Sequence, residues 1–495
     1  MASDKRVVTT CDCKVCNGIR SRLNKIFVVL ETYGWLLDTY IVDFFVDNVW
    51  DKLPSRWRNI LGDVDSEELG NWVMGKKSST RVWPLSLLAL QKTIKTLEIN
   101  RDHENKETLR CSGYRNKKFE NLPSETSDSL PALPGTKRKR IDTKHQKLFT
   151  KSVKKKKCHE VENIAQTTSE CAEVAKCECI VDIGAGMGHL ARTLAYNYGL
   201  AVVCLEQDKL LSQQAKIFDD RLSVELRKKI PKIVLRNPRH ISTRIVESDI
   251  LGKGLMGKLK NEFTKNFILN QSQHGFGLIG LHTCGDLAAN LIRLYSHHNE
   301  IRFICIVGCC YMKITCGIKD TGSFGYPLSN CVSLMKNHEF SYAALEVACH
   351  AIENHCEKLI TGDYHDLLVH AYRATLETIL VEKSGESIRR SHLKNVKLKG
   401  NMTFERYCTI ATENLHPVNR PDPEDLKTFE VEKRLERWRE VVAFGTLRFF
   451  LAPLVETAVL FDRFLYLSEK NLLPVLHPVF DPKISPRNIV LTSCK

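Results

Sequence analysis

A glycine-rich segment carries the clearest chemical signal in this sequence. Asp182 ends a short apolar run, and Gly184, Gly186 and Gly188 follow it before a helix-like segment at 190–198. A strand, a glycine-rich turn and a helix in this order form a nucleotide-binding corner. Glycines there allow a tight turn, the close approach of a ligand, and the packing of the helix on the sheet. The three glycines are therefore predicted to bind a cofactor.

The charge beside the glycines indicates which cofactor. A dinucleotide would place a pyrophosphate at this corner, and the Asp182 carboxylate would repel it. S-adenosylmethionine has no phosphate, and a carboxylate attracts its ammonium and sulfonium groups. His189 also stands where the dinucleotide fingerprint has Gly or Ala. We predict that Asp182 binds the methionine end of S-adenosylmethionine, and we disfavour an NAD-dependent oxidoreductase.

Two further acidic residues follow apolar runs. Glu206 closes the run at 201–205 and lies 24 residues after Asp182. An acid at the end of the second strand is placed to accept hydrogen bonds from both ribose hydroxyls. Asp249 follows the run at 244–248, which reads as a third strand. Asp249 is therefore predicted to face the adenine amino group.

The later strands place candidate catalytic residues at the same edge of the sheet. Apolar runs at 277–281 and 303–308 alternate with helix-like segments, which is typical of a parallel sheet covered on both faces. His282 and Asp286 follow the first of these runs, and either can take a proton from an acceptor. The structural alternatives are a histidine hydrogen-bonded to the backbone and an aspartate that caps the next helix.

These motifs resemble those of a known family. The glycine corner, the segment Gly-Leu-His-Thr-Cys-Gly-Asp-Leu at 280–287 and the segment Val-Gly-Cys-Cys-Tyr at 307–311 are similar to the methyltransferase-like protein twenty-five family. The resemblance covers most of the chain outside residues 99–157. It implies an α/β, Rossmann-like class I S-adenosylmethionine-dependent methyltransferase, whose sheet closes with a hairpin that has one reversed strand.

The resemblance leaves the acceptor open. The family is sometimes labelled as a ribosomal RNA adenine dimethylase. Enzymes that methylate an exocyclic base amine usually carry Asp/Asn-Pro-Pro-Tyr/Phe after the fourth strand, where the aromatic ring stacks the flipped base. That tetrapeptide is missing from the sequence. The motif at 280–287 therefore argues against adenine dimethylation.

Most of the basic character lies in one segment. The chain has a formal net charge of +15, and residues 137–157 hold eleven Lys and Arg against one Asp. The clusters Lys137–Arg140 and Lys154–Lys157 have the form of a bipartite nuclear localisation signal, which would bind a nuclear import receptor. The alternatives are an arm that binds RNA and a solvated linker.

The cysteines and the apolar stretches indicate the compartment. Nineteen cysteines, an odd number with many in apolar strands, indicate a reducing compartment, either the nucleus or the cytoplasm or both. The chain start has no apolar signal region, and the most apolar stretch, 441–467, contains charged residues. It reads as a core helix, and no membrane partner is predicted.

A metal site is not predicted. Cys11, Cys13 and Cys16 lie close together, and the last two have the Cys-x2-Cys spacing of zinc sites. Cys111 and Cys158 come much later, and no second pair follows at a suitable distance.

The predicted organisation has four parts. It places a disordered N-terminus at 1–16, a helical region at 17–98, a disordered basic linker at 99–157 and a methyltransferase domain at 158–495, with a helical insertion after strand five at about 318–440. The predicted function is transfer of a methyl group from S-adenosylmethionine, with RNA as the acceptor. A protein methyltransferase and a catalytically inactive scaffold of the same fold are the alternatives.

Overall fold

A computed structural model describes the chain from residue 11 to residue 495, apart from 77–80, 106, 114–140, 142, 152, 232, 268–274, 318–324, 363–364, 399 and 401. The chain divides into two compact units. The first comprises Met1–Phe27, Asn100–Phe340 and Thr457–Lys495. The second comprises Val28–Ile99 and Ser341–Glu456.

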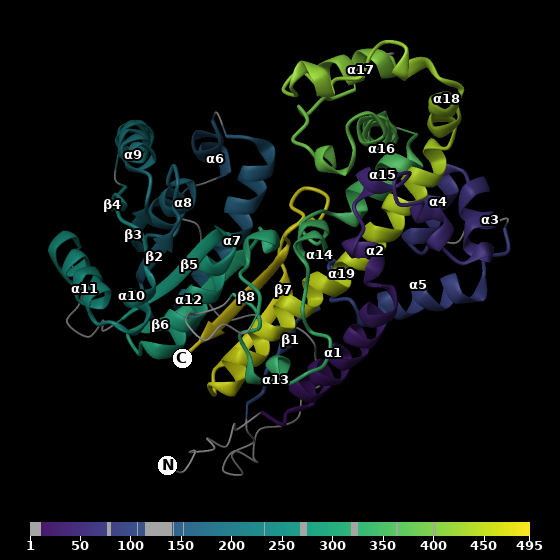
Figure 1. The fold of residues 1–495 in the computed structure, drawn as a ribbon. Helices are drawn as coiled ribbons and strands as arrows, with labels where there is room; N and C mark the ends of the chain where they lie inside the picture. Colours follow the sequence, from purple (N-terminus) through teal and green to yellow (C-terminus); the bar gives the residue numbers. More distant parts are fainter. Residues whose placement is uncertain are drawn as a thin grey trace, which may run out of the picture. The chain divides into compact units, whose positions relative to one another are not determined.

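The first unit is built on one eight-stranded sheet (Figure 1). Along the sheet the order is β1-β7-β8-β6-β5-β2-β3-β4. The strands from β4 to β6 in this order run parallel to one another, and β8 pairs antiparallel with both β6 and β7. The predicted closing hairpin with one reversed strand is therefore confirmed. The strands are β1 Leu109–Arg110, β2 Cys179–Ile183, β3 Ala201–Glu206, β4 Arg239–Ser242, β5 Phe276–Thr283, β6 Ile301–Gly308, β7 Leu473–Pro478 and β8 Ile489–Cys494.

Helices cover both faces of this sheet. Thr168 of α7 contacts Cys305 of β6, whereas Tyr295 of α12 bonds to Ser493 of β8. Cys305 pairs with Thr492, and the next residue, Ser493, points to the other face because side chains alternate along a strand. The helices of this unit are α6 Thr143–Thr150, α7 Lys155–Val174, α8 His189–Asn197, α9 Lys209–Lys229, α10 Glu247–Leu251, α11 Gly254–Asn266, α12 Asp286–His297 and α13 Asn330–Ser333.

Buried apolar side chains explain why the central strands form. All residues of β2 and β3 are buried, as expected for parallel strands covered on both faces. The predicted α/β, Rossmann-like fold is confirmed. The predicted third strand is wrong: β4 is Arg239–Ser242, and Asp249 lies instead in the short helix α10. As the last strand of the order, β4 pairs only with β3, and its sequence, Arg-His-Ile-Ser, is largely polar.

The predicted disordered segments are corrected where the structure describes them. Within 99–157, β1 adds to the edge of the sheet through β7, and α6 and the start of α7 are helical. Within 1–16, helix α1, Lys14–Tyr33, has already begun, and Cys11 and Cys16 are buried. Residues 1–10 and 114–140 lie outside the described residues.

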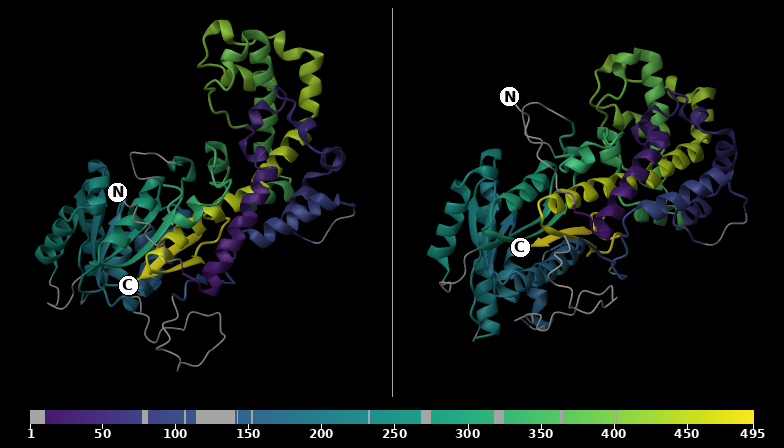
Figure 2. Two further views of the ribbon diagram at one scale, coloured as in Figure 1. Left: turned by 60° about the horizontal axis from the view of Figure 1, so that its bottom comes forward. Right: turned by 90° about the horizontal axis from the view of Figure 1, so that it is seen from below.

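Among its described residues, the second unit contains helices and connecting segments but no strand (Figure 2). Asp43, fully buried, is paired with Arg389 at 3.1 Å and Arg390 at 2.6 Å, which ties residues from the two halves of the chain together. The helical N-terminal region and the insertion are therefore one unit rather than two domains. Its helices are α2 Trp35–Asp38, α3 Ser55–Asp63, α4 Ser66–Val73, α5 Leu85–Leu97, α14 Tyr342–Val347, α15 Ile352–Ile360, α16 His365–Ser384, α17 Phe404–Ala411 and α18 Phe429–Glu436.

Helix α19, Trp438–Glu469, contributes residues to both units. By length and mean hydropathy it passes the test for a membrane-spanning helix. However, 94% of its most apolar window is buried inside the structure, which is typical of a core helix. Its interpretation as a core helix therefore fits its environment.

Candidate functional site

The glycine corner leaves open space at the end of β2. Gly184 and Gly186 have φ angles of 69° and 55°, which favour glycine. A Cβ atom added to either would meet no atom of the described residues within 4 Å beyond its chain neighbours. At Gly188 an added Cβ would lie 2.8 Å from the ring of His240. Gly184 and Gly186 therefore suit the approach of a ligand, whereas Gly188 serves packing, which narrows the predicted set of cofactor-binding glycines.

Glu206 joins the second strand to the same corner. Its Oε2 accepts a hydrogen bond of 2.9 Å from the backbone N–H of Gly186, and its Oε1 accepts one of 3.0 Å from the N–H of Asp208. A carboxylate has about four acceptor positions. Glu206 thus holds the glycine turn and still has capacity for two ligand hydroxyls.

Asp182 is a buried residue of β2 and is not among the residues that line the cleft at the end of that strand. It is 2% exposed, and its Oδ2 has no hydrogen-bond partner among the described residues. Burial raises the pKa of Asp182 to about 7; the charge of Lys157 lowers this pKa and that of Glu206 raises it. Buried polar atoms of native proteins are nearly always hydrogen-bonded. The Oδ2 atom is therefore a candidate partner for a donor that a ligand or a water molecule brings.

A cleft opens at the carboxyl ends of β2, β3 and β5, where open α/β sheets bind their ligands. It encloses about 1060 Å³ outside the protein atoms, counting space open to solvent. The structure places Gly184, Glu206 and Asp286 of the predicted site residues on its wall. The complete lining is Ile183, Gly184, Leu205, Glu206, Gln207, Thr243, Arg244, Ile245, Cys284, Asp286, Leu287 and Asn290.

Asp249 is not among the residues that line this cleft. Its Oδ2 accepts a hydrogen bond of 2.9 Å from the backbone N–H of Val246, at the start of α10. The carboxylate therefore satisfies a helix N-terminus, as acids in a first turn commonly do. The position predicted for it, at the end of a strand, is wrong. The residues that follow β4 on the cleft wall are Thr243, Arg244 and Ile245.

His282 is bonded to a buried carboxylate. Its Nε2 lies 3.0 Å from Oε2 of Glu160, a residue of α7 that is 1% exposed. Oε1 of the same carboxylate accepts a hydrogen bond of 2.8 Å from Ser485. Burial raises the pKa of Glu160, but His282, Ser485 and Lys156 lower it by more, so the net shift is downward. The partner of His282 is thus an ionised carboxylate, not the backbone group of the structural alternative.

The backbone of His282 is also unusual. Its φ angle is 67°, in the left-handed region that side chains other than glycine seldom adopt, and the register of β5 against β6 shifts at this point. Such conformations cluster at functional sites. A partly exposed imidazole, fixed by a carboxylate, can accept a proton and be stabilised when charged.

Asp286 has a positioning role in this structure. Its Oδ1 accepts a hydrogen bond of 2.8 Å from the N–H of Thr315, and its Oδ2 accepts one of 2.6 Å from the hydroxyl of Thr315. Both carboxylate oxygens therefore fix the segment that follows β6. Because Asp286 also lines the cleft and a carboxylate has about four acceptor positions, its predicted role toward the acceptor stays a prediction.

Three thiols meet beside the cleft. Sγ of Cys284 lies 3.0 Å from that of Cys309 and 3.2 Å from that of Cys310. Hydrogen bonds from Cys309 and Cys310 lower the pKa of Cys284 to about 5, against the effect of burial. The sequence places these cysteines at strand ends but does not show that they touch.

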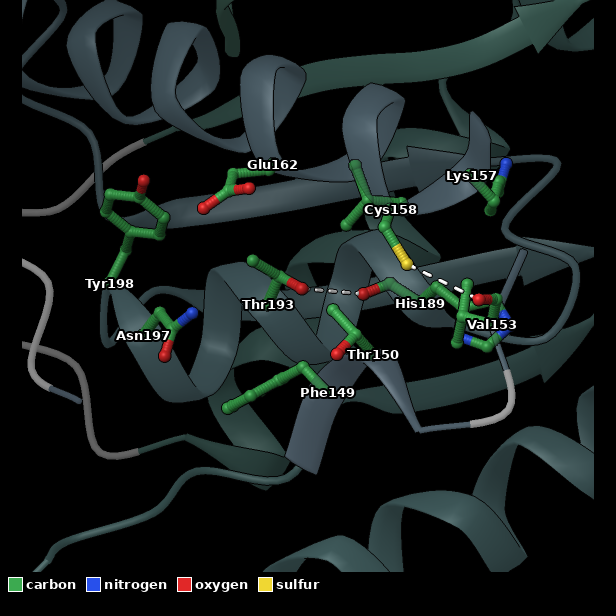
Figure 3. Close-up of a pocket in the computed structure, with 11 residues that line it drawn as sticks. Phe149, Thr150, Val153, Lys157, Cys158, Glu162, His189, Thr193, Asn197 and Tyr198 are labelled. Carbon is green, nitrogen blue, oxygen red and sulfur yellow. Dashed lines mark hydrogen bonds between the residues drawn. The ribbon is translucent and has the colours of Figure 1, made fainter. Parts of the chain in front are cut away.

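A second pocket shares no lining residue with this cleft (Figure 3). Residues of α6, α7 and α8 line it, among them Phe149, Cys158 and Thr193. In Figure 3 the Cys158 thiol bonds to the carbonyl of Val153, and the hydroxyl of Thr193 bonds to the carbonyl of His189. These two bonds satisfy Cys158 and Thr193, whereas Oδ1 of Asn197, which also lines the pocket, has no hydrogen-bond partner among the described residues. The candidate site is assigned to the larger cleft because Gly184 and Glu206 lie on its wall.

Comparisons with known proteins indicate a methyltransferase domain in this part of the chain. Residues 156–317 match a family described as a methyltransferase domain. The chain is 29% identical over 228 residues to probable methyltransferase-like protein 25 of Homo sapiens, covering 44% of this chain and 36% of that protein. It is 28% identical over 229 residues to the Mus musculus protein of the same name, covering 44% of this chain and 37% of that protein. The chain thus matches little more than a third of the length of these relatives. The resemblance predicted from the motifs is confirmed.

Proposed function

We propose that this chain, whose residues 156–317 form a methyltransferase domain, transfers a methyl group from S-adenosylmethionine to RNA. One observation carries the proposal of the donor. At the ends of β2 and β3, Gly184 and Gly186 have open space beside them and the N–H of Gly186 bonds to the carboxylate of Glu206, while Oδ2 of Asp182 has no partner among the described residues. This corner is acidic and suits a cation that has no phosphate.

Each residue of the corner would bind a different part of the donor. Glu206 would accept hydrogen bonds from the ribose hydroxyls, and Asp182 would attract the ammonium group. Gly184 and Gly186 would allow the donor to lie against the backbone. The bound donor supplies a methyl group on a sulfonium, which is already an activated electrophile, so the protein contributes mainly alignment and proton removal.

His282 would remove the proton from the acceptor. It lies at the end of β5, beside the cleft residue Cys284, and the carboxylate of Glu160 fixes its ring. A carboxylate behind an imidazole stabilises the charged form that proton transfer produces. Hydroxyl, amide and ring-nitrogen acceptors suit this arrangement.

Exposed lysines near the histidine support RNA as the acceptor. Lys154, Lys155 and Lys156 are exposed at the start of α7, one turn before Glu160. Nζ of Lys156 lies 3.8 Å from Oε1 of Glu160. Phosphate contacts by lysine and arginine supply a large share of the affinity of nucleic-acid complexes. The other half of the basic segment, Lys137–Arg140, lies outside the described residues.

The substrate class can be tested directly. Extract from cells that lack the protein would be incubated with the full chain and a donor labelled in its methyl group, and then divided between ribonuclease and protease. Label that ribonuclease releases is the expected result. Label that only protease releases would indicate a protein methyltransferase. Absence of label from both fractions, with donor binding intact in calorimetry, would indicate an inactive scaffold.

Replacing Lys154 and Lys155 together by glutamine is expected to lower the affinity for RNA and to make this affinity less dependent on salt concentration. Loss of two phosphate contacts to a single strand should reduce the slope of log K against log salt by about 1.4. Filter binding of total RNA over a salt series measures this slope. The matched control replaces Lys228 and Lys229, exposed residues at the end of α9, by glutamine. Equal slopes for the two variants would count against the proposed RNA contact.

Donor binding is expected to weaken below pH 7. Because the pKa of Asp182 is raised to about 7, this group loses its charge as the pH falls through that value. The cationic donor favours the ionised form, so its affinity should fall by about tenfold for each pH unit below the pKa. Calorimetry between pH 5.5 and pH 8.5 would measure the profile. Asp182→Asn should bind more weakly at pH 8 and show a flat profile; a variant that keeps the wild-type profile would exclude Asp182 as the titrating group.

A further inference from the structure

Four cysteine thiols, here called the N-terminal thiol cluster, gather outside the donor cleft. The cluster consists of Cys11, Cys13, Cys16 and Cys111, whose sulfur atoms all lie within 4.8 Å of one another. Sγ of Cys111 lies 3.6 Å from Cys11, 4.0 Å from Cys13 and 3.6 Å from Cys16. None of the nineteen cysteines, all of which the structure describes, is in a disulfide.

These distances match those of a tetrahedral metal site. Thiolates bind zinc at about 2.3 Å, so sulfur atoms at the corners of a regular tetrahedron around the ion are about 3.8 Å apart. Three of the distances fall within a few tenths of an ångström of that value. A disulfide would require about 2.05 Å. We propose that the N-terminal thiol cluster binds one structural zinc ion through four thiolates.

The surroundings of the sulfur atoms favour thiolates. The backbone N–H of Cys16 donates to Sγ of Cys13 at 3.4 Å, and the N–H of Gly113 donates to Sγ of Cys111 at 3.4 Å. Cys13 and Cys16 lie at the N-terminus of the 20-residue helix α1, where the helix dipole stabilises negative charge. Gly113 has a φ angle of 71°, which suits the turn that brings its N–H back to the sulfur.

The site would hold together two parts of the first unit that are far apart in the sequence. Strand β1 has only two residues, Leu109 and Arg110, paired with β7, and Cys111 adds one backbone hydrogen bond of 3.0 Å to Pro474. So short an edge strand is weakly held by its own pairing. Sγ of Cys16 also lies 3.5 Å from the hydroxyl of Ser468 in α19. A zinc ion bound here would fasten the start of α1 to the edge of the sheet and keep β1 paired with the outer edge of β7.

This site is difficult to predict from the sequence because its ligands do not form two Cys-x2-Cys pairs. Cys13 and Cys16 have the expected spacing, but Cys11 lies two residues before them and Cys111 lies 95 residues after Cys16. Only the pairing of β1 with β7 brings the fourth ligand to the other three. The absence of a second Cys-x2-Cys pair therefore does not exclude a metal.

Metal analysis of the full chain, purified without chelators, tests the proposal. We expect Cys111→Ser to lower the zinc content by one equivalent per chain relative to wild type. The matched control Cys331→Ser, a partly buried cysteine outside both thiol clusters, should leave the zinc content unchanged. Cys284→Ser should also leave the one zinc ion of the N-terminal thiol cluster in place. Unchanged zinc in Cys111→Ser, or loss of this equivalent in Cys284→Ser, would overturn the proposal.

A second measurement on the wild-type chain avoids variants that fail to fold. Native protein is alkylated with and without a strong zinc chelator, and each cysteine is then read by mass spectrometry. Cys11, Cys13, Cys16 and Cys111 are expected to become reactive together when the chelator is added, whereas Cys331 should react equally in both samples. Reaction of the four without chelator, protection that the chelator does not relieve, or disulfides among them would contradict a zinc site.

Discussion

Replacing His282 by asparagine is expected to lower the rate of methyl transfer by about 10²- to 10⁴-fold, the usual contribution of a positioned general base. Asparagine tolerates the positive φ angle of this position, 67°, better than most residues, so the backbone should be preserved. The rate would be measured as label transferred from a methyl-labelled donor to total RNA of cells that lack the protein.

Donor binding provides the control for this variant. His282 is not among the residues that line the donor cleft, so the dissociation constant for S-adenosylmethionine should stay within about twofold of wild type. A rate that falls only in proportion to lost donor binding would show that His282 acts on the fold and not on the acceptor. A rate close to wild type would exclude the histidine as the base.

Glu160 adds a second readout to the same experiment. As a positioning residue it should affect the pH dependence of the rate as well as the rate itself, because its carboxylate bonds to the ring of His282. Glu160→Gln keeps the size of the side chain but removes the charge. The acidic limb of the pH–rate profile, where a general base becomes protonated, should move to lower pH when the charge is removed, whereas a purely structural role would lower the rate equally at every pH.

Local patterns allowed the corner to be predicted from the sequence. The runs that became β2 and β3 are fully buried in the structure, and continuous apolar runs are the signature of such strands. The glycines between β2 and α8 have the φ angles that their residue type suggests. The position of Glu206 followed from the same logic, because it closes an apolar strand.

Contacts between distant residues could not be predicted in this way. Glu160 and His282 are separated by 122 residues, and nothing in their local sequences indicates that they touch. For Asp249, in contrast, a local sequence pattern predicted a strand that the structure does not contain. Ile245 and Val246 made the segment that leads into α10 look like a buried strand. The strand at this edge of the sheet is β4, which pairs only with β3 and is largely polar. Strand β1, with two residues, is too short for any periodic pattern.

Replacing Glu206 by alanine is expected to weaken donor binding by roughly a hundredfold. Two hydrogen bonds from ribose hydroxyls to a carboxylate are worth about 1.5 kcal/mol each, and a total of about 3 kcal/mol corresponds to that factor in the dissociation constant. Isothermal calorimetry with S-adenosylmethionine would measure the change. Glu225→Ala, which removes an exposed acid from α9, should leave the dissociation constant unchanged.

The ribose contact can be separated from the support that Glu206 gives to Gly186. Because its Oε2 also accepts the N–H of Gly186, alanine would loosen the turn as well as remove the ribose partner. A donor analogue without the 2′-hydroxyl distinguishes the two effects in a double-mutant cycle. Wild type should bind the analogue more weakly than the donor, whereas Glu206→Ala should bind both alike. If the variant still discriminates between them as strongly as wild type does, or if the heat of donor binding is unchanged, Glu206 does not hold the ribose.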